Sequence, residues 1–124
     1  MPRTRKDEVA ISVDVPVLQG RYAELDEFTV SFETFPQDAD ATAVYRGLPD
    51  DRCQCPHWGI VLSGRLTLRF ADRQEVYRAG DVYYAPPGHV PVVAAGTETV
   101  EFSPTRDLRQ TMNVLASNLA GGMR

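Results

Sequence analysis

Short runs of strand-forming residues, separated by turn-forming residues, fill most of this chain. Between about residues 9 and 102 the runs are rich in Val, Tyr, Phe and Thr, and Gly, Pro and Asp interrupt them. β-branched and aromatic side chains favour strands, whereas Gly, Pro and Asp favour turns. Because the runs are short and turns follow one another closely, the pattern predicts an all-β, mainly antiparallel sandwich or barrel.

Alternating apolar side chains locate the individual strands. Positions 11, 13, 15 and 17 are apolar, which predicts a half-buried strand over residues 11–17. Phe28, Val30 and Phe32 repeat this period, and residues 41–45 are a further short candidate. The later predicted strands are 57–62, 65–71, 75–78, 82–85, 89–94 and 98–102. Ser63-Gly64 is typical of a hairpin turn between the first two of these.

The hydrophobic period changes to that of a helix after residue 103. The apolar side chains then fall on one helical stripe, formed by Leu108, Met112, Leu115 and Leu119. Ser103 suits the N-cap position, Pro104 suits the first helical position, and Gly121-Gly122 provides the stop. We therefore expect a C-terminal helix that packs on the sheet or on a partner subunit.

Length and charge limit the function classes. With 124 residues the chain can form one domain but not two, which we expect to comprise a basic N-terminal tail (1–8), a β-barrel (9–103) and the helix (104–120). A net charge of −4 argues against a general nucleic-acid binder. The sequence has neither a membrane-spanning segment nor a signal peptide pattern. We therefore expect a cytoplasmic protein with reduced cysteines and no membrane partner.

Every cysteine and histidine of the chain belongs to two short segments. Cys53, Cys55 and His57 occupy alternate positions, and His89 follows a Pro-Pro-Gly sequence. Alternate side chains of a strand point to one face, so the first three converge on one ion if Pro56 bends the strand. Thiolate and imidazole ligands favour Zn²⁺ over Mg²⁺ or Ca²⁺. These four residues are therefore the predicted ligands of a divalent metal, zinc first, with Fe, Mn and Ni as alternatives.

The order of these residues resembles the cupin superfamily of small β-barrel proteins. Val61-Leu62-Ser63-Gly64 matches the end of the first cupin motif, and Gly80-Asp81 with Pro86-Pro87-Gly88 matches the second. The 15 residues from 65 to 79 match the short cupin spacing, and the likeness covers about residues 41–102. The resemblance implies an antiparallel jelly-roll barrel, a metal at its mouth and an unidentified small-molecule ligand. It also implies a homodimer, formed through the N-terminal extension and the C-terminal helix.

The ligand residues differ from the usual cupin set. In the family a His-x-His pair precedes a glutamate, and here these positions fall on Asp51, Cys53 and His57. Asp51 also fits an ordinary turn. The usual histidine of the second motif falls on Pro91, whereas His89 lies two residues earlier. The resemblance therefore implies the fold and the location of the site, but not the dioxygenase chemistry of iron-dependent cupins.

Four further residues are candidates for the lining of a pocket, namely Trp58, Tyr83, Tyr84 and Glu101. Aromatic residues in strands are also common core residues, so both interpretations stay open. If Glu101 points inward, it can act as a base or as an extra ligand. Its apolar neighbours Val100 and Phe102 instead place Glu101 on the outer face.

Three functions are consistent with these residues. The first is a metalloenzyme that acts on a small polar or carbonyl-containing molecule, and the second is a non-catalytic, metal-stabilised binding or sensing module. The third is a redox switch built on Cys53 and Cys55. Four protein ligands would close a zinc site, whereas three leave a position for water or substrate.

Overall fold

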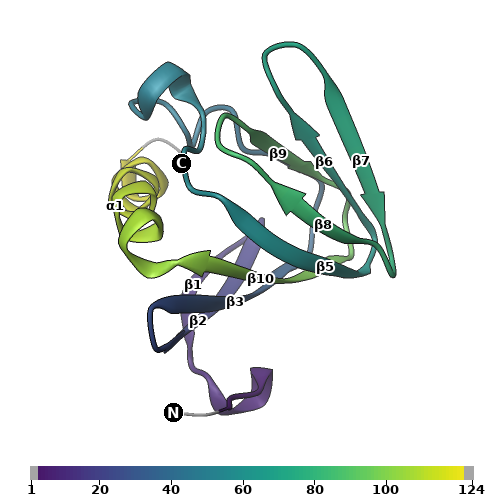
Figure 1. Ribbon diagram of the computed structural model, residues 1–124, viewed down its shortest axis with the longest axis vertical. Coiled ribbons are helices and arrows are strands. Elements are labelled where there is room, and N and C mark those ends of the chain that lie inside the picture. Colours follow the sequence, from purple (N-terminus) through teal and green to yellow (C-terminus); the bar gives the residue numbers. More distant parts are fainter. Residues whose placement is uncertain (1–2, 122–124) are drawn as a thin grey trace.

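Two antiparallel sheets face each other in the computed structural model, which describes residues 3–121 (Figure 1). The larger sheet has the strand order β1-β2-β3-β10-β5-β8, and the smaller has the order β4-β9-β6-β7. The strands are β1 Ile11–Val15, β2 Leu18–Leu25, β3 Phe28–Phe35, β4 Ala39–Asp40, β5 His57–Ser63, β6 Arg65–Arg69, β7 Gln74–Arg78, β8 Val82–Ala85, β9 Val90–Val93 and β10 Thr97–Pro104. Short 3₁₀ helices occupy η1 Lys6–Glu8 and η2 Pro49–Asp51. The predicted all-β barrel with a C-terminal helix is confirmed.

The core consists of two clusters along the space between the sheets. One cluster is formed by Val61, Leu66, Leu68, Tyr83, Ala85 and Val93. The other is formed by Val44, Tyr45, Leu48, Cys53, Cys55 and Val90. Burial of these side chains supplies the main driving force that holds the two sheets together. The predicted cysteine ligands thus lie in the second cluster, at the end of the barrel next to the helix.

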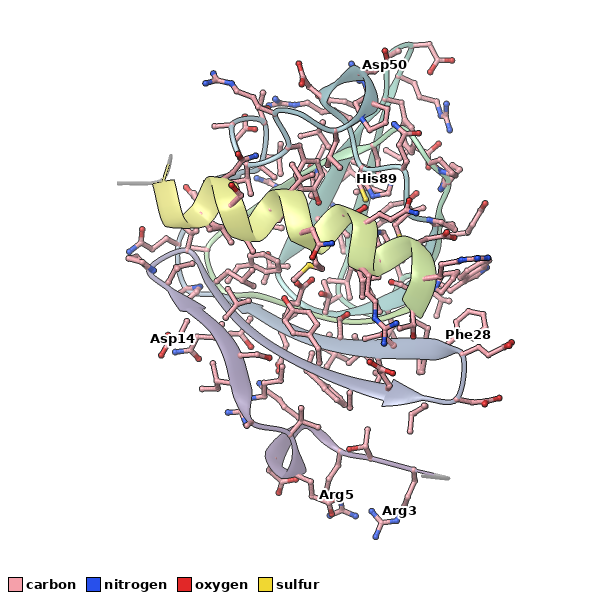
Figure 2. The ribbon with its side chains drawn as sticks, turned by 90° about the vertical axis from the view of Figure 1, so that its left-hand side faces the viewer. Arg3, Arg5, Asp14, Phe28, Asp50 and His89 are labelled. Carbon is pink, nitrogen blue, oxygen red and sulfur yellow. The ribbon has the colours of Figure 1, made fainter. Side chains whose placement is uncertain are left out.

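The helix α1, Thr105–Gly121, closes this end of the barrel. Its Leu108, Leu115 and Leu119 pack against the second core cluster, as the predicted stripe requires. Figure 2 shows α1 crossing the molecule in front of the segment that carries His89. The helix begins at Thr105, whose backbone N–H donates to the Glu27 carbonyl oxygen over 3.0 Å. The described helix ends at Gly121, the first glycine of the predicted stop, and Gly122 lies outside the described residues.

Several of the strand predictions differ from the structure. The strand predicted over residues 11–17 ends at Val15, because Pro16 and Val17 form the turn into β2. Residues 41–45 form turns and not a strand, and only the short β4 precedes them. The alternation of apolar residues does not predict β2, because Gly20, Arg21 and Glu24 interrupt it.

The inner face of the large sheet is more polar than the strand periods predicted. On β10, Thr97, Thr99 and Ser103 are at most 2% exposed, whereas Phe102 is 43% exposed. On β3, Thr29 and Ser31 are buried and Phe28 is exposed. Glu101 lies two residues from Thr99 and two from Ser103, so its side chain faces the same side of the strand as these buried residues. The prediction that Glu101 points outward is therefore wrong. Polar inward-facing residues are typical of a barrel that encloses a binding cavity.

The N-terminal segment lies on the outer face of the large sheet. The Lys6 ammonium donates to Glu98 and to Thr34, and the Arg21 guanidinium donates to the carbonyl oxygens of Lys6 and Val9. Lys6 of the predicted basic tail therefore contacts the barrel, and the first two residues of the tail lie outside the described residues. Between residues 3 and 121, no helix has both the length and the apolar character that a membrane crossing requires.

Candidate metal centre

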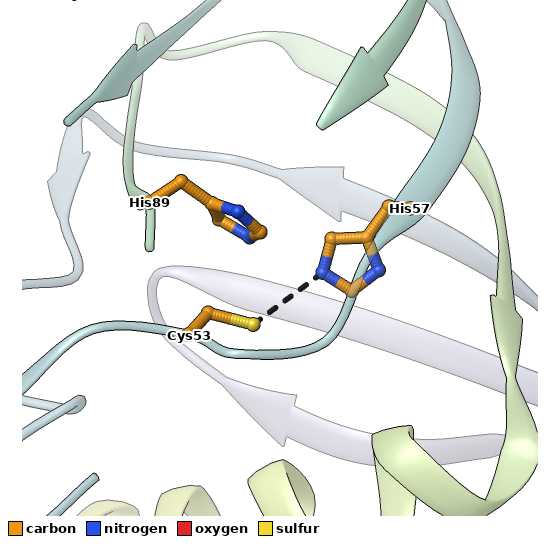
Figure 3. A group of neighbouring side chains, drawn as sticks. All are labelled: Cys53, His57 and His89. Atoms are coloured by element: carbon orange, nitrogen blue, oxygen red, sulfur yellow. Dashed lines mark hydrogen bonds between the residues drawn. The ribbon is translucent and has the colours of Figure 1, made fainter. Parts of the chain in front are cut away.

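Cys53, His57 and His89 meet inside the barrel, where one ligand atom from each lies within 4.8 Å of the others (Figure 3). All three side chains are buried, with exposed fractions of 0%, 7% and 1%. The Cys53 Sγ is 3.5 Å from the His57 Nε2. Ligands of a tetrahedral zinc ion, with bonds of about 2.0–2.3 Å, lie roughly 3.3–3.8 Å apart. The group therefore fits a single zinc ion with small side-chain adjustments.

The backbone brings these three residues together from separate segments. His57 is the first residue of β5 and pairs with Ala85 of β8. Cys53 precedes that strand and forms an isolated antiparallel bridge with His89, which lies just before β9. The Cys53 N–H donates to the His89 carbonyl oxygen over 2.9 Å. Two predicted ligands from different motifs are thus held side by side by backbone hydrogen bonds.

The other ring nitrogen of each histidine is held by a neighbour. The His89 Nδ1 lies 2.8 Å from the Pro86 carbonyl oxygen, which accepts and never donates a hydrogen bond. His89 therefore carries its proton on Nδ1 and presents a lone pair on Nε2. The His57 Nδ1 lies 2.6 Å from the Ser103 Oγ and 3.9 Å from the Glu101 Oε1. Such partners fix the orientation of metal-binding histidines in proteins.

The fourth predicted ligand, Cys55, is not part of this group. The chain bends at Cys55 instead of continuing as an extended strand, so the alternation expected from the sequence does not apply there. Its thiol lies 3.4 Å from the Pro56 carbonyl oxygen. The structure thus places Cys53 and His57 together and leaves the intervening cysteine outside the cluster. Asp51 is also outside, because it lies in η2 and accepts the Gly47 N–H.

Both cysteines are poorly placed for thiol chemistry with solvent. Cys53 is 0% exposed and Cys55 is 1% exposed. Burial raises the pKa of Cys53 to about 11 and the pKa of Cys55 to about 12. Since the thiolate is the form that reacts with oxidants, these features disfavour the redox-switch interpretation.

An inner cavity of about 50 Å³ adjoins the candidate metal centre. His57, His89, Glu33, Tyr45 and Glu101 are among its lining residues. This space holds one or two water molecules or a small functional group of a ligand. A metal held by three protein ligands would therefore have a polar, protein-enclosed space beside it.

Two carboxyl groups line this inner cavity, and each hydrogen-bonds to a tyrosine. The Tyr22 hydroxyl donates to Glu33 over 2.7 Å, and the Tyr83 hydroxyl donates to Glu101. Burial, followed by the charge of Glu101, raises the pKa of Glu33 to about 7, although the bond from Tyr22 opposes the rise. Burial also lowers the pKa of His89 to about 4, with a further contribution from His57. The cavity thus holds a carboxyl group able to exchange a proton near neutral pH.

The four predicted pocket residues divide into two pairs. Glu101 and Tyr83 lie inside the barrel, where their hydrogen bond places the carboxyl group at the cavity wall. Trp58 and Tyr84 are 43% and 48% exposed, and their rings stack on each other at 5.2 Å. They follow the buried His57 and Tyr83 by one residue, so strand alternation places them on the outer face. The expectation that Trp58 and Tyr84 line the cavity therefore disagrees with the structure.

Glu33 and Tyr45 also line the inner cavity, although neither is among the residues predicted from the sequence. Glu33 continues the polar alternation of Thr29 and Ser31 on β3, the same pattern that Thr99 and Glu101 show on β10. These two polar series were the available signal, because strands that pair in register put such series on the same face. Tyr45 lies in a turn segment, where no periodic pattern of side chains indicates which residues are buried.

Comparison with solved structures identifies the architecture. A protein of unknown function from Rhizobium leguminosarum has a TM-score of 0.62 and 15% identity, with 83% of this chain and 95% of that chain covered. An RmlC-like cupin from Shewanella frigidimarina has a TM-score of 0.56 and 17% identity, with 82% and 88% covered. A Cupin 2 conserved barrel domain protein from Salinispora arenicola has a TM-score of 0.56 and 16% identity, with 91% and 97% covered.

Sequence comparisons add no closer relationship. No protein-family model matches the sequence, and no curated protein matches it either. The two facing antiparallel sheets, the strand order and the cupin structures that match most of the chain show that this protein has the fold of the cupin superfamily.

Proposed function

We propose that this chain binds one divalent metal ion, preferably zinc, through Cys53, His57 and His89, and acts as a small metalloenzyme on a molecule that enters the barrel. The observation that supports this most is the convergence of three buried ligand atoms within 4.8 Å of one another. A thiolate and two imidazoles are ligands that zinc prefers over the alkaline-earth ions. Three protein ligands leave a coordination position free, which is typical of catalytic and not of structural zinc.

The hydrogen-bond partners of the two histidines are of the kind that metal-binding histidines have in proteins. The Pro86 carbonyl oxygen holds the Nδ1 of His89, and the Ser103 hydroxyl contacts the Nδ1 of His57. Both contacts leave the Nε2 atoms available for coordination. A bound zinc ion supplies Lewis acidity, which polarises a carbonyl or hydroxyl oxygen of the substrate.

Side chains of the protein supply the groups for proton transfer. Glu33 and Glu101 line the cavity beside His57, and a tyrosine hydroxyl orients each carboxyl group. The raised pKa of Glu33, about 7, suits a group that accepts or donates a proton at neutral pH. We assign Glu33 the role of general acid–base and Glu101 the role of holding the His57 ring in place.

Metal content of purified variants tests the proposal. We expect near-stoichiometric zinc in the wild type, and loss of zinc in Cys53→Ser, His57→Ala and His89→Ala. Cys55→Ser is the matched control, because Cys55 is equally buried but lies outside the cluster. Absence of zinc from the wild type after incubation with zinc salts would contradict metal binding. Loss of zinc in Cys55→Ser would instead indicate a closed, four-ligand site.

A cobalt-substituted sample separates an enzyme from a closed binding module. With a free coordination position, added azide or imidazole should change the visible absorption of the cobalt protein. An absorption spectrum that stays unchanged at saturating azide and imidazole would contradict the open site. That result would favour the non-catalytic, metal-stabilised module.

A further inference from the structure

A second, larger cavity leads from the surface to the inner one. It has a volume of about 320 Å³ and lies between the end of α1, the β1–β2 turn and the segment that follows β4. The two cavities share Glu33, Phe35, Tyr45 and Pro91 as lining residues. We refer to the larger cavity as the mouth. Its volume is in the range that holds a small organic ligand.

The mouth is apolar, and its charged residues are acidic. Its apolar lining includes Val17, Leu18, Val44, Leu115 and Leu119. Asp38 and Asp40 are its acidic residues apart from the shared Glu33. Neither cavity has a lysine or an arginine among its described lining residues.

This lining discriminates between ligands by charge. A carboxylate or phosphate group in the mouth would lose its hydration with no lysine or arginine in the described lining to compensate, since the neighbouring Arg69 is already paired with Asp40 over 3.1 Å. An apolar group gains free energy when it leaves water for the leucine and valine side chains. A hydroxyl or ammonium group that reaches the inner cavity meets the Glu33 carboxyl group as a hydrogen-bond acceptor.

We propose that the ligand of this barrel is a neutral or cationic molecule, with an apolar body in the mouth and a hydroxyl or amine head beside Glu33. The inference rests on the proposed function only for the statement that this head reaches the metal centre. An anionic body is disfavoured in the mouth, because no lysine or arginine is among its described lining residues.

Three matched probes test this ligand class, namely phenylpropanol, phenylpropylammonium and phenylpropanoate. We expect NMR titrations of the chain to show shifts at Val44, Leu115 and Leu119 with the alcohol and the ammonium compound. Phenylpropanoate should bind at least tenfold more weakly. Equal binding of phenylpropanoate, or the failure of all three probes to shift the mouth residues, would overturn the proposal.

A charge placed in the mouth provides the second arm of the test. Leu115→Arg should strengthen the binding of phenylpropanoate and weaken that of the ammonium probe. Ala116→Arg, on the exposed neighbouring position of α1, is the control and should change neither. The titrations are run on zinc-loaded and on chelator-treated protein. Binding at the mouth therefore reports on the ligand class, whereas zinc content in the same samples reports separately on the proposed function.

Discussion

The backbone N–H of Cys53 donates to the carbonyl oxygen of His89 over 2.9 Å, and the Gly88 N–H returns a bond to the Cys53 carbonyl oxygen over 2.7 Å. This pair of bonds joins two segments of the chain that each carry a candidate metal ligand. The positions of the Sγ and the imidazole are therefore set by backbone geometry before any metal binds. Preorganisation of this kind lowers the entropic cost of forming a metal site.

Gly88 is the first test of this backbone link. Its φ of +97° lies in the left-handed region, and Gly80 in the β7–β8 turn has a nearly equal φ of +92°. Gly88→Ala and Gly80→Ala should both lower the free energy of unfolding by about 1–2 kcal/mol. We expect only Gly88→Ala to weaken zinc binding, by about tenfold or more. Competition with a chromophoric chelator measures the zinc affinity, and equal affinities in the two variants would contradict the link.

Ser103 should matter for zinc affinity although it does not reach the ion. Its Oγ is 2.6 Å from the His57 Nδ1, so Ser103→Ala frees the imidazole to rotate. We predict a loss of zinc affinity of about 10–100-fold, the usual effect of removing such a partner. Thr97→Ala removes another buried hydroxyl from β10, one that bonds to the Ala94 carbonyl oxygen instead. This control should lose stability while its zinc affinity stays at the wild-type value.

Glu33 should make the stability of the metal-free protein depend on pH. Burial raises its pKa from 4.5 to about 7, so between these values the native state holds a proton that the unfolded chain has released. The free energy of unfolding therefore falls as the pH rises through this window. Glu33→Gln removes this loss and keeps an oxygen that accepts the Tyr22 hydroxyl. We expect the variant to exceed the wild type by about 1–3 kcal/mol above pH 7, and by almost nothing near pH 4.5.

Urea unfolding in the presence of a chelator, repeated across this pH range, measures the difference between wild type and Glu33→Gln. The titration of His89 is common to both proteins and cancels. Glu24→Gln, which removes an exposed carboxyl group that pairs with Arg109 on the surface, is the control for the loss of one acidic side chain. A Glu33→Gln stability difference that is independent of pH would show that Glu33 titrates alike in the folded and unfolded states.

The fold was largely predictable from local patterns. Turn residues such as Ser63-Gly64 and Gly80-Asp81 mark the ends of strands, and these turns occur where the structure has them. The leucine stripe of α1 also packs as its spacing predicted. Each of these features depends on residues that are close in sequence, so periodicity and turn chemistry are sufficient to locate them.

The candidate site was only partly predictable, because the alternation of side chains along a strand was not sufficient at two positions. Cys55 lies at a bend, where the rule that alternate residues share a face does not hold. Glu101 was placed outside on the assumption that apolar residues point inward, yet the barrel interior is polar and Phe102 faces outward. Which face of a strand is buried depends on the cavity that the strands enclose together, and this is not encoded in the residues of one strand.

X-ray absorption of the zinc-loaded protein measures the ligand set directly, and so tests the site formed by Cys53, His57 and His89. We expect one sulfur ligand at about 2.3 Å and two imidazole nitrogens at about 2.0–2.1 Å, with a light atom in the remaining position. We assign the sulfur to Cys53, so the zinc-loaded Cys55→Ser variant should keep one sulfur ligand at the same distance. Two sulfur ligands per zinc in the wild type would contradict the open three-ligand site, because Cys55 would then complete a closed one.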